Sequence, residues 1–175
     1  MNLRRIAVFL DRDGTIIEDK NYLKNPEDVV LLGGAREAIE ILKNMGCLLF
    51  LFSNQSGVGR GFFTADDVQM CNCRMVELLG CGEKIFDEIC LAFESPWEIS
   101  VYRKPSPKFI IEMMEKYKLL PENCYMVGDK ESDVLAARNA AITPILISNC
   151  SDSDFKGINI FSSIFSFSNW LIRSE

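Results

Sequence analysis

The chain has 175 residues, 48% of them hydrophobic and 25% charged, which suits one globular domain spanning residues 1–175. Its formal net charge of −6 disfavours a nucleic-acid partner, because affinity for phosphate backbones comes mainly from Lys and Arg. No histidine is present, which excludes a Ser-His-Asp triad, an imidazole base and a His-containing zinc site.

The cysteines and the N-terminal segment bear on the compartment. Seven cysteines are an odd number, and most lie in apolar or helix-like runs, which predicts buried thiols in a reducing compartment. The first apolar run, Ile6–Leu10, is too short for a signal-peptide core or a membrane span. We therefore expect a cytoplasmic protein without a membrane partner. The cysteines are Cys47, Cys71, Cys73, Cys81, Cys90, Cys124 and Cys150.

Apolar runs bounded by turn residues alternate along the chain with segments of helical period. This order predicts an α/β fold, a Rossmann-like three-layer sandwich with a central parallel sheet whose strands are buried on both faces. Five strands are expected, at Ile6–Leu10, Cys47–Phe52, Glu88–Ala92, Cys124–Val127 and Pro144–Ile147.

Four helices are expected between and after these strands, and the tail follows them. Thr64 with Asp67 three residues later resembles a capping arrangement, and Gly46 supplies a stop for the first helix. The helices are expected at Ala35–Met45, from Thr64 to Leu79, at Pro107–Tyr117 and at about Ser132–Ala140. The tail Phe155–Arg173 is expected to pack on the body through Phe161, Ile164, Phe165, Phe167, Trp170 and Leu171.

The longest irregular segments follow directly after predicted strands. They are Arg12–Leu32, Asn54–Phe63 and Phe93–Lys104. Ligands of open α/β sheets bind at the carboxyl ends of the strands, so these three loops are expected to line one cleft.

Two pairs of acids stand at predicted strand ends. Asp11 and Asp13 follow the first strand, and a turn at Gly14 can bring both carboxylates towards one centre. Asp129 and Asp133 follow the fourth strand in the same manner. Clustered carboxylates repel one another unless they share a cation or a proton, and oxygen ligands without histidine suit Mg²⁺.

Groups of the opposite polarity follow two other strands. Ser53, Asn54 and Gln55 offer a hydroxyl and amides, which are donors that hold phosphoryl oxygens. Lys104 adds a positive charge before Pro105, and Arg103 is a candidate for recognising an anionic substrate. Each string alone is typical of a solvated turn or loop. Four such strings at strand ends favour one shared site.

At these residues the chain resembles the haloacid dehalogenase (HAD) superfamily. The four superfamily motifs match Asp11-Arg12-Asp13-Gly14-Thr15, Ser53, Lys104, and Gly128-Asp129 with Asp133, and the match spans about residues 6–148. Longer strings around these motifs resemble the subgroup of heptose bisphosphate 7-phosphatases and histidinol-phosphate phosphatases. They are Asp-Arg-Asp-Gly-Thr, Ser-Asn-Gln-Ser-Gly-Val-Gly-Arg-Gly, Arg-Lys-Pro-Ser-Pro and Met-Val-Gly-Asp-Lys.

The resemblance implies a HAD-like fold and a magnesium-dependent phosphatase that forms an aspartyl-phosphate. Asp11 would attack phosphorus, and Asp13 would protonate the leaving alkoxide and then deprotonate water. Mg²⁺ would bind Asp11, the backbone carbonyl of Asp13 and Asp129, with Asp133 in support. Ser53 and Lys104 would bind the transferring phosphoryl group.

The same resemblance implies a sugar phosphate as the small-molecule substrate, such as D-glycero-D-manno-heptose 1,7-bisphosphate losing its 7-phosphate. Neither long inter-motif interval has room for a large cap domain, so an open site is expected. The chain is expected to be a monomer or a small homo-oligomer. The residues expected at the substrate are Asp19, Tyr22, Asn54, Gln55, Arg60, Arg103 and Lys130.

One segment departs from that subgroup. The relatives carry a zinc loop of cysteines and a histidine before the Arg-Lys-Pro string, and here only Cys90 remains of that ligand set. A lone thiol is better interpreted as a small buried hydrophobe, so we predict no structural zinc. Phe93, Trp97 and Tyr102 are expected to pack the shortened loop, whose change leaves the identity of the substrate open.

Other functions remain to be distinguished. A histidinol-phosphate phosphatase or another small-metabolite phosphatase fits the same motifs. A phospho-receiver domain also phosphorylates an aspartate beside Mg²⁺, although its acceptor follows a central strand in mid-chain. A phosphosugar-binding protein without turnover is disfavoured by the intact Asp11, Asp13, Lys104 and Asp129, and dehalogenase chemistry by the second aspartate and the metal cluster.

Overall fold

A computed structural model describes residues 5–82, 84–149 and 157–174. Its centre is a six-stranded sheet in the order β3-β2-β1-β4-β5-β6, in which every neighbouring pair is parallel. This arrangement confirms the predicted α/β class and the parallel sheet. The strands are β1 (Ala7–Leu10), β2 (Leu48–Asn54), β3 (Glu88–Ala92), β4 (Cys124–Gly128), β5 (Thr143–Ile147) and β6 (Asn159–Phe161).

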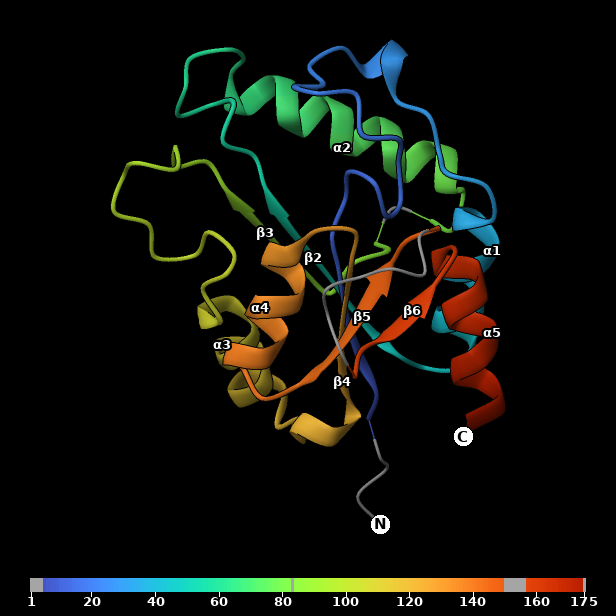
Figure 1. Ribbon diagram of the computed structural model, residues 1–175. Coiled ribbons are helices and arrows are strands. Elements are labelled where there is room, and N and C mark those ends of the chain that lie inside the picture. The colour runs from blue at the N-terminus through green and yellow to red at the C-terminus, as the bar shows by residue number, and fades with distance from the viewer. Residues whose placement is uncertain (1–4, 83, 150–156, 175) are drawn as a thin grey trace.

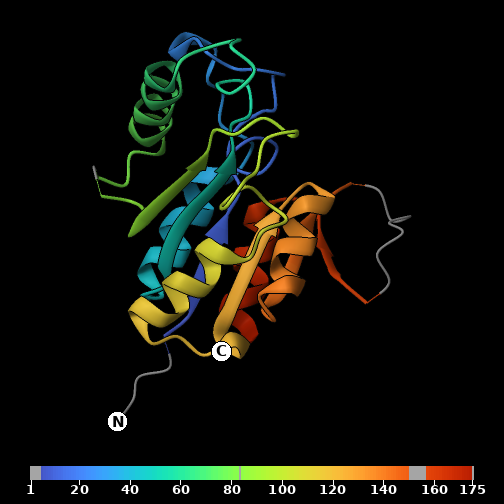
Figure 2. The same cartoon turned by 90° about the vertical axis from the view of Figure 1, so that its left-hand side faces the viewer.

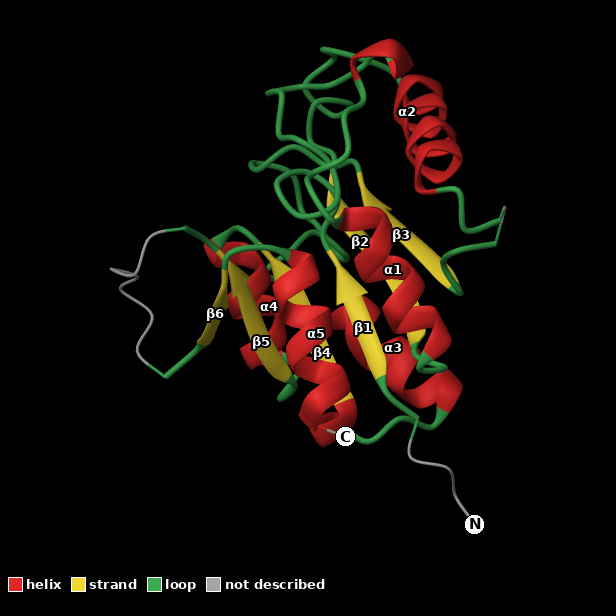
Figure 3. Cartoon of the chain, turned by 90° about the vertical axis from the view of Figure 1, so that its right-hand side faces the viewer, coloured by secondary structure: helices red, strands yellow, loops and turns green. Residues whose placement is uncertain are grey.

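Helices cover both faces of this sheet (Figure 1). On one face lie α1 (Ala35–Asn44) and α5 (Ile164–Ser174), and on the other lie α3 (Lys108–Tyr117) and α4 (Glu131–Asn139) (Figure 2). Helix α2 (Ala65–Leu79) and the loop between β1 and α1 extend beyond the carboxyl ends of the strands (Figure 3). Two 3₁₀ turns complete the description, η1 (Pro26–Asp28) and η2 (Pro121–Asn123).

Strand β1 lies between the two hydrophobic cores. Val8 and Leu10 pack into the core under α1, α2 and α5, whereas Ala7 and Phe9 pack into the core under α3 and α4. Successive side chains of a strand point to opposite faces, so a strand between two layers must be apolar at every position. All four residues of β1 are fully buried, which fixes the direction in which the chain enters the loop after Leu10.

The edges of the sheet depart from the sequence prediction. Strand β3 was expected to be buried on both faces, but it is an edge strand and Ile89 is 48% exposed. The predicted five strands also omitted β6, which pairs with β5 at the opposite edge. Strand β3 carries a continuous apolar run although it lies at an edge, which is why it was interpreted as central, whereas β6 has only three residues and no such run.

The tail packs on the body through the predicted residues, which are buried to different degrees. Ile164, Phe167 and Leu171 are buried at helical spacing and face α1, but Phe165 is 39% exposed and Trp170 is 36% exposed. These two residues still pack on the body, because the ring centre of Trp170 lies 6.4 Å from that of Tyr125 and 5.5 Å from that of Phe161, and Phe165 lies beside Gly34. Residues 155 and 156 of the predicted tail lie outside the described residues.

The cysteines are less uniformly buried than expected. Of the six in the described part of the chain, none is in a disulfide, and Cys73 is exposed on the outer side of α2. Its neighbour Cys71 is buried, so the helix directs the two thiols apart. Cys150 lies outside the described residues. No helix in the described ranges combines the length and apolar character needed to cross a bilayer.

Candidate active site

The register of the sheet brings the ends of β1 and β4 together. Leu10 pairs with Leu51 on β2 and with Val127 on β4, and the amide of Asp11 donates to the Val127 carbonyl at 2.9 Å. The residues that follow these strands therefore meet at one edge of the sheet. Parallel strands expose their carboxyl ends together, which is the usual position of a ligand site in an open α/β sheet.

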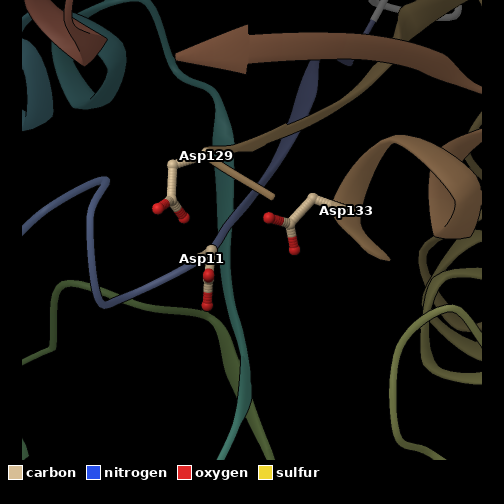
Figure 4. A group of neighbouring side chains, drawn as sticks. All are labelled: Asp11, Asp129 and Asp133. Atoms are coloured by element: carbon tan, nitrogen blue, oxygen red, sulfur yellow. The ribbon is translucent and has the colours of Figure 1, made fainter. Parts of the chain in front are cut away.

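Three carboxylates converge at this edge (Figure 4). Asp11 follows β1, Asp129 follows β4, and Asp133 lies in the first turn of α4. One oxygen of each can be chosen so that all three lie within 4.8 Å of one another. Asp11 and Asp133 are buried and Asp129 is half-buried, so neither solvent nor distance separates the three charges.

Two glycines allow the acids to approach so closely. Gly14 has a φ of +79°, and a Cβ at this position would lie 2.2 Å from Oδ2 of Asp129. A Cβ on Gly128 would lie 2.2 Å from Oδ2 of Asp133. Such separations are far below van der Waals contact, so both positions require glycine for the present arrangement. Steric exclusion of a Cβ thus explains why glycine follows Asp13 and precedes Asp129.

Lys104 contributes positive charge to the same cluster. Its Nζ lies 2.9 Å from Oδ1 of Asp11 and 2.5 Å from Oδ1 of Asp133, and all three side chains are at most 6% exposed. Burial opposes the charged form of the lysine, but these two carboxylates outweigh burial and raise the pKa of Lys104 above its usual value. The lysine therefore remains a cation inside the site.

The remaining negative charge is less well compensated. Burial raises the pKa of Asp129 to about 7, and the charges of Asp11 and Asp133 add to this effect against Lys130. Burial also raises the pKa of Asp133, although Lys104 opposes the increase. Three clustered acids with one buried lysine leave an excess of negative charge, which a bound cation would neutralise.

The donor set fits a hard cation. All three groups offer carboxylate oxygens, and Oδ1 of Asp129 is buried without a hydrogen-bond partner among the described residues. A buried polar atom that lacks a partner is costly unless something binds it. These are the carboxylates expected from the sequence as Asp11, Asp129 and the supporting Asp133. Among the described residues, these three aspartates are the set of potential metal-ligand side chains that lie close enough together to share one ion. The set contains no cysteine.

The end of β2 supplies neutral donors beside the acids. Ser53 is buried, and its Oγ accepts a hydrogen bond from Nε2 of Gln55 at 2.9 Å. Asn54 is joined to Lys104 by two reciprocal hydrogen bonds, because its Nδ2 donates to the Lys104 carbonyl and its Oδ1 accepts from the Lys104 amide. This pair of contacts ties the lysine loop to the end of β2 and fixes the direction in which Lys104 enters the site.

The carboxylate of Asp13 is not part of the three-acid group. It accepts hydrogen bonds from Arg12 and from Gln55, whose Nε2 lies 2.8 Å from Oδ2 of Asp13. The metal role expected for Asp13 involves its backbone carbonyl, which leaves the side chain available for other chemistry. No role was expected for Arg12 from the sequence. An arginine between two acids directly after a buried strand has little access to solvent, and this placement in the sequence could have indicated a role for Arg12.

Two adjoining cavities of about 180 Å³ and 210 Å³ open at this edge. Asp13, Asn54 and Lys130 line both cavities. Asp11, Ser53, Lys104 and Arg103 line one, whereas Asp19, Tyr22 and Gln55 line the other. The predicted convergence of three loops on one cleft is thus present, with the β1–α1 loop and the loops after β2 and β3 each supplying lining residues.

An ion pair crosses the rim of the first cavity. Nζ of Lys130 lies 2.8 Å from Oδ2 of Asp19, which joins the β4–α4 turn to the β1–α1 loop. Burial opposes the charged form of Lys130, but Asp19 and Asp129 raise its pKa above the usual value. Asp19 and Lys130, both predicted to bind substrate, therefore lie at the cleft and form an ion pair with each other.

Arg60 lies at the outer rim rather than in the cavity lining. Its guanidinium carbon is 5.0 Å from the ring centre of Trp97 and 6.0 Å from that of Tyr22, so two aromatic side chains flank it. Burial lowers the pKa of Arg103, and repulsion from Arg60 adds to this effect. Two arginines close enough to repel each other at one rim form a local positive region on an acidic protein.

The shortened loop after β3 is held by hydrogen bonds. The amide and hydroxyl of Ser95 both donate to Oε2 of Glu98, and Nη1 of Arg103 donates to the Glu94 carbonyl at 3.3 Å. Tyr102 packs against the α3–α4 core as expected, but Trp97 is 73% exposed. The expectation that Trp97 packs inside this loop was wrong, because its ring covers Arg60 instead.

Cys90 lies on β3 rather than in the loop, and it is half-buried. Burial raises the pKa of its thiol to about 12. Burial of this thiol accords with the interpretation of Cys90 as a small hydrophobe.

Comparisons with known proteins agree with the geometry. A family model described as haloacid dehalogenase-like hydrolase matches residues 21–141, a span that begins after Asp11 and Asp13. A D-glycero-beta-D-manno-heptose-1,7-bisphosphate 7-phosphatase from Helicobacter pylori is 37% identical over 138 residues, which are 78% of this chain and 79% of that protein. A phosphatase of the same description from Pasteurella multocida is 34% identical over 154 residues, which are 78% of this chain and 77% of the other.

A solved structure also has this fold. The D,D-heptose 1,7-bisphosphate phosphatase from B. bronchiseptica, described as complexed with magnesium and phosphate, superimposes with a TM-score of 0.88. The superposition covers 97% of this chain and 99% of that one, at 24% identity. This similarity confirms the predicted HAD-like fold.

Proposed function

The chain belongs to the haloacid dehalogenase-like hydrolases, and from this membership we propose that it is a phosphatase that hydrolyses a sugar phosphate through a covalent intermediate on Asp11. The substrate we propose is a heptose 1,7-bisphosphate that loses its 7-phosphate. The relatives at 34–37% identity are described as acting on that compound, and they align over more than three quarters of this chain.

The observation that carries the proposal is the convergence of four separate segments at Asp11. Its carboxylate lies beside the lysine from the β3–α3 loop and the acids that follow β4. Asp13 and Ser53 line the same cavity. A nucleophile, a fixed cation, hydrogen-bond donors and a second carboxyl are the parts that phosphoryl transfer through an enzyme carboxylate requires.

Mg²⁺ is the cofactor we propose for the carboxylate cluster. Asp11, Asp129 and the backbone carbonyl of Asp13 would hold it, with Asp133 orienting Lys104 and the start of α4 around it. When bound, the ion would neutralise charge on the phosphoryl oxygens. The unpartnered Oδ1 of Asp129 and the excess of negative charge support this assignment.

Asp11 would form the bond to phosphorus while the bond from phosphorus to the ester oxygen breaks. Lys104, held between Asp11 and Asp133, presents a fixed positive charge where the transferring phosphoryl oxygens gather. Ser53, whose hydroxyl already accepts from Gln55, can donate its own proton to one of those oxygens. None of these groups has to reorganise during the transfer, because Lys104 and Ser53 are both buried and tied to neighbours.

Asp13 would serve each half of the reaction. Its protonated carboxyl donates to the alkoxide as that group leaves, and the resulting carboxylate then accepts a proton from the water that attacks the aspartyl-phosphate. Its position supports this assignment, because Asp13 lines both cavities and its side chain is 15% exposed. Asp11, in contrast, is almost enclosed.

The positive rim favours a substrate with a second phosphate. Arg103 lines the cavity of the proposed nucleophile, and Arg60 lies close enough to Arg103 to repel it. In the described part of the chain neither arginine forms an ion pair. A second anionic group would relieve their mutual repulsion while the first phosphate reacts at Asp11.

Phosphate release in the presence of Mg²⁺ tests the proposal. We expect Asp11→Asn to lower kcat by more than about 10³-fold, since it removes the nucleophile without changing the shape of the side chain. In Asp13→Asn we expect the second half-reaction to slow, so that intact-protein mass spectra show a phosphorylated species. Full activity of Asp11→Asn, or phosphate on another residue, would reject Asp11 as nucleophile.

A panel of esters tests the substrate. Heptose 1,7-bisphosphate, histidinol phosphate and simple hexose monophosphates should be compared by kcat/KM with wild type and with Arg103→Met. We expect the bisphosphate to be preferred by wild type and the preference to shrink in Arg103→Met, while the monophosphates change little. Equal losses on all esters would refute the proposed contact of Arg103 with a second phosphate.

A further inference from the structure

Arg12, the residue between the two acids of the first motif, has a fully buried charged side chain. It is only 1% exposed and is the largest of the fully buried side chains. Enclosing a guanidinium is costly unless its donors are satisfied, and well-packed apolar residues often replace buried ion pairs without loss of stability. The contacts of Arg12 therefore indicate what a buried arginine, rather than an apolar residue, contributes at this position.

The guanidinium of Arg12 binds the carboxylate of Asp13 from one side. Its Nε donates to Oδ2 at 3.0 Å and its Nη2 donates to Oδ1 at 3.1 Å. Two parallel hydrogen bonds from a planar guanidinium fix the rotation of a carboxylate as well as its position. Gln55 supplies a third hydrogen bond to this carboxylate, by donating to Oδ2. The orientation of Asp13 is therefore determined from two segments of the chain.

Arg12 is itself held in place by Asn72 and Gln55, two side chains from other segments of the chain. Its Nη1 donates to Oδ1 of Asn72 on α2 at 3.0 Å, and its Nη2 donates to Oε1 of Gln55 at 3.0 Å. Asn72 is only 3% exposed. The backbone carbonyl of Arg12 accepts from the amides of Ile16 and Ile17, which closes the turn after Asp13. The guanidinium thus links α2 and the end of β2 to the acid.

We propose that Arg12 is a positioning residue that aims the Asp13 carboxyl at the leaving-group oxygen, with Asn72 holding Arg12. This inference rests on the proposed function, because it needs Asp13 as the group that protonates the alkoxide. In that step the proton moves from Asp13 to the ester oxygen as the bond from this oxygen to phosphorus breaks and the bond from Asp11 to phosphorus forms. In this first half-reaction, which kcat/KM reports because it covers the steps up to loss of the leaving group, a misdirected Asp13 slows only substrates whose leaving group needs that proton. Hydrolysis of the aspartyl-phosphate also uses Asp13 and is common to every ester, so it affects kcat for all of them.

Leaving-group dependence separates this role from a merely structural one. A sugar phosphate expels a strongly basic alkoxide, whereas 4-nitrophenyl phosphate expels a stabilised phenolate that leaves without protonation. We expect Arg12→Met to lower kcat/KM for the sugar phosphate by about 10- to 100-fold, since misplacing a reacting group by about 1 Å can cost about 100-fold. The value for 4-nitrophenyl phosphate should fall much less.

Two further variants test the route through Asp13. Arg12→Lys keeps the charge but loses the two-pronged contact, so it should share the selective loss on the sugar phosphate. In an Asp13→Asn background, Arg12→Met should cause no additional loss, because the group that it positions is already unable to donate a proton. Asn72→Ala should show the same selectivity more weakly.

A matched control comes from Arg36, which also contacts α2. Its Nη2 donates to the Leu78 carbonyl far from the cleft, so Arg36→Met should leave both esters unchanged. Thermal unfolding with Mg²⁺ present shows whether each variant is folded, and if Arg12→Met is not, Arg12→Lys and Asn72→Ala carry the comparison.

The outcomes distinguish this inference from the proposed function. Equal losses on both esters, or a further loss from Arg12→Met in the Asp13→Asn background, would overturn the positioning role while leaving the phosphatase intact. Absence of Mg²⁺-dependent hydrolysis by wild type on every ester would overturn the proposed function, and the role of Arg12 with it.

Discussion

The lysine enclosed between two acids gives the most direct test of the site's electrostatics. In Lys104→Met the side chain keeps a similar length but loses its charge, so Asp11 and Asp133 remain buried without their partner at 2.9 Å and 2.5 Å. Removing one member of a buried pair typically costs about 3–5 kcal/mol, because the other charge stays in a poorly solvated place. That is a large part of a domain's total stability of roughly 5–15 kcal/mol.

The expected shift in the thermal midpoint follows from that cost. For a chain of this size, each kcal/mol corresponds to about 2–4 °C, so Lys104→Met should melt roughly 6–20 °C below wild type in metal-free buffer. Mg²⁺ should recover part of this loss and should stabilise the variant more than wild type. Without Lys104, the ion would be the positive charge in direct contact with the clustered carboxylates, while Lys130 acts on Asp129 from the rim.

Thermal and urea unfolding followed by circular dichroism, with and without Mg²⁺, measure the shift in thermal midpoint and the stabilisation by the ion. Lys116→Met is the matched control, because Lys116 pairs with Glu88 at the exposed edge of the sheet and its loss should change the unfolding free energy little. The reasoning fails if Lys104→Met unfolds at the same urea concentration as wild type without Mg²⁺. It also fails if Mg²⁺ stabilises both proteins equally.

Three smaller perturbations address other features. Gly128→Ala places a Cβ where the Asp133 carboxylate now lies, so Mg²⁺-dependent kcat should fall about 10- to 100-fold; unchanged phosphate release across a Mg²⁺ titration would contradict this. Thr64→Ala removes the capping hydroxyl of α2 and should lower the unfolding free energy by about 1 kcal/mol without altering kcat; a urea midpoint equal to wild type would contradict it. Burial raises the pKa of Cys90 to about 12, so its thiol stays neutral from pH 8 to 10 and iodoacetamide should modify it more slowly than the exposed Cys73. The rate of Cys90 modification should keep rising towards pH 12. Equal modification rates for Cys90 and Cys73 in peptide mass spectra would refute the raised pKa of Cys90.

The central elements could be predicted because burial leaves a simple pattern. A strand covered on both faces must be apolar throughout, and the predicted bounds of β1 to β5 differ from the structure by at most two residues at either end. Strand β6 could not be found this way. It has three residues, none of them fully buried, and lies at the edge of the sheet, so only its pairing with β5 identifies it.

The positions of the clustered acids were predictable for a related reason. Asp11 and Asp129 end two apolar runs, and parallel strands deliver their carboxyl ends to one edge. The partners of Asp13 were not predictable from the sequence. The contact between Arg12 and Asn72 joins residues 60 positions apart and depends on where α2 lies, which no local pattern specifies. The flanking of Arg60 by Trp97 and Tyr22 has the same origin, because three loops must first be placed.

The first motif places two carboxylates two residues apart, and the structure gives each its own cation. Lys104 contacts Asp11, whereas Arg12 contacts Asp13, so the charge that supports the proposed nucleophile is separate from the charge that holds the proposed acid. This separation allows the two steps to be perturbed independently. Loss of Lys104 weakens support for phosphoryl transfer itself and should lower kcat/KM for alkyl and nitrophenyl esters alike, whereas loss of Arg12 should lower kcat/KM only for the esters whose leaving group must be protonated.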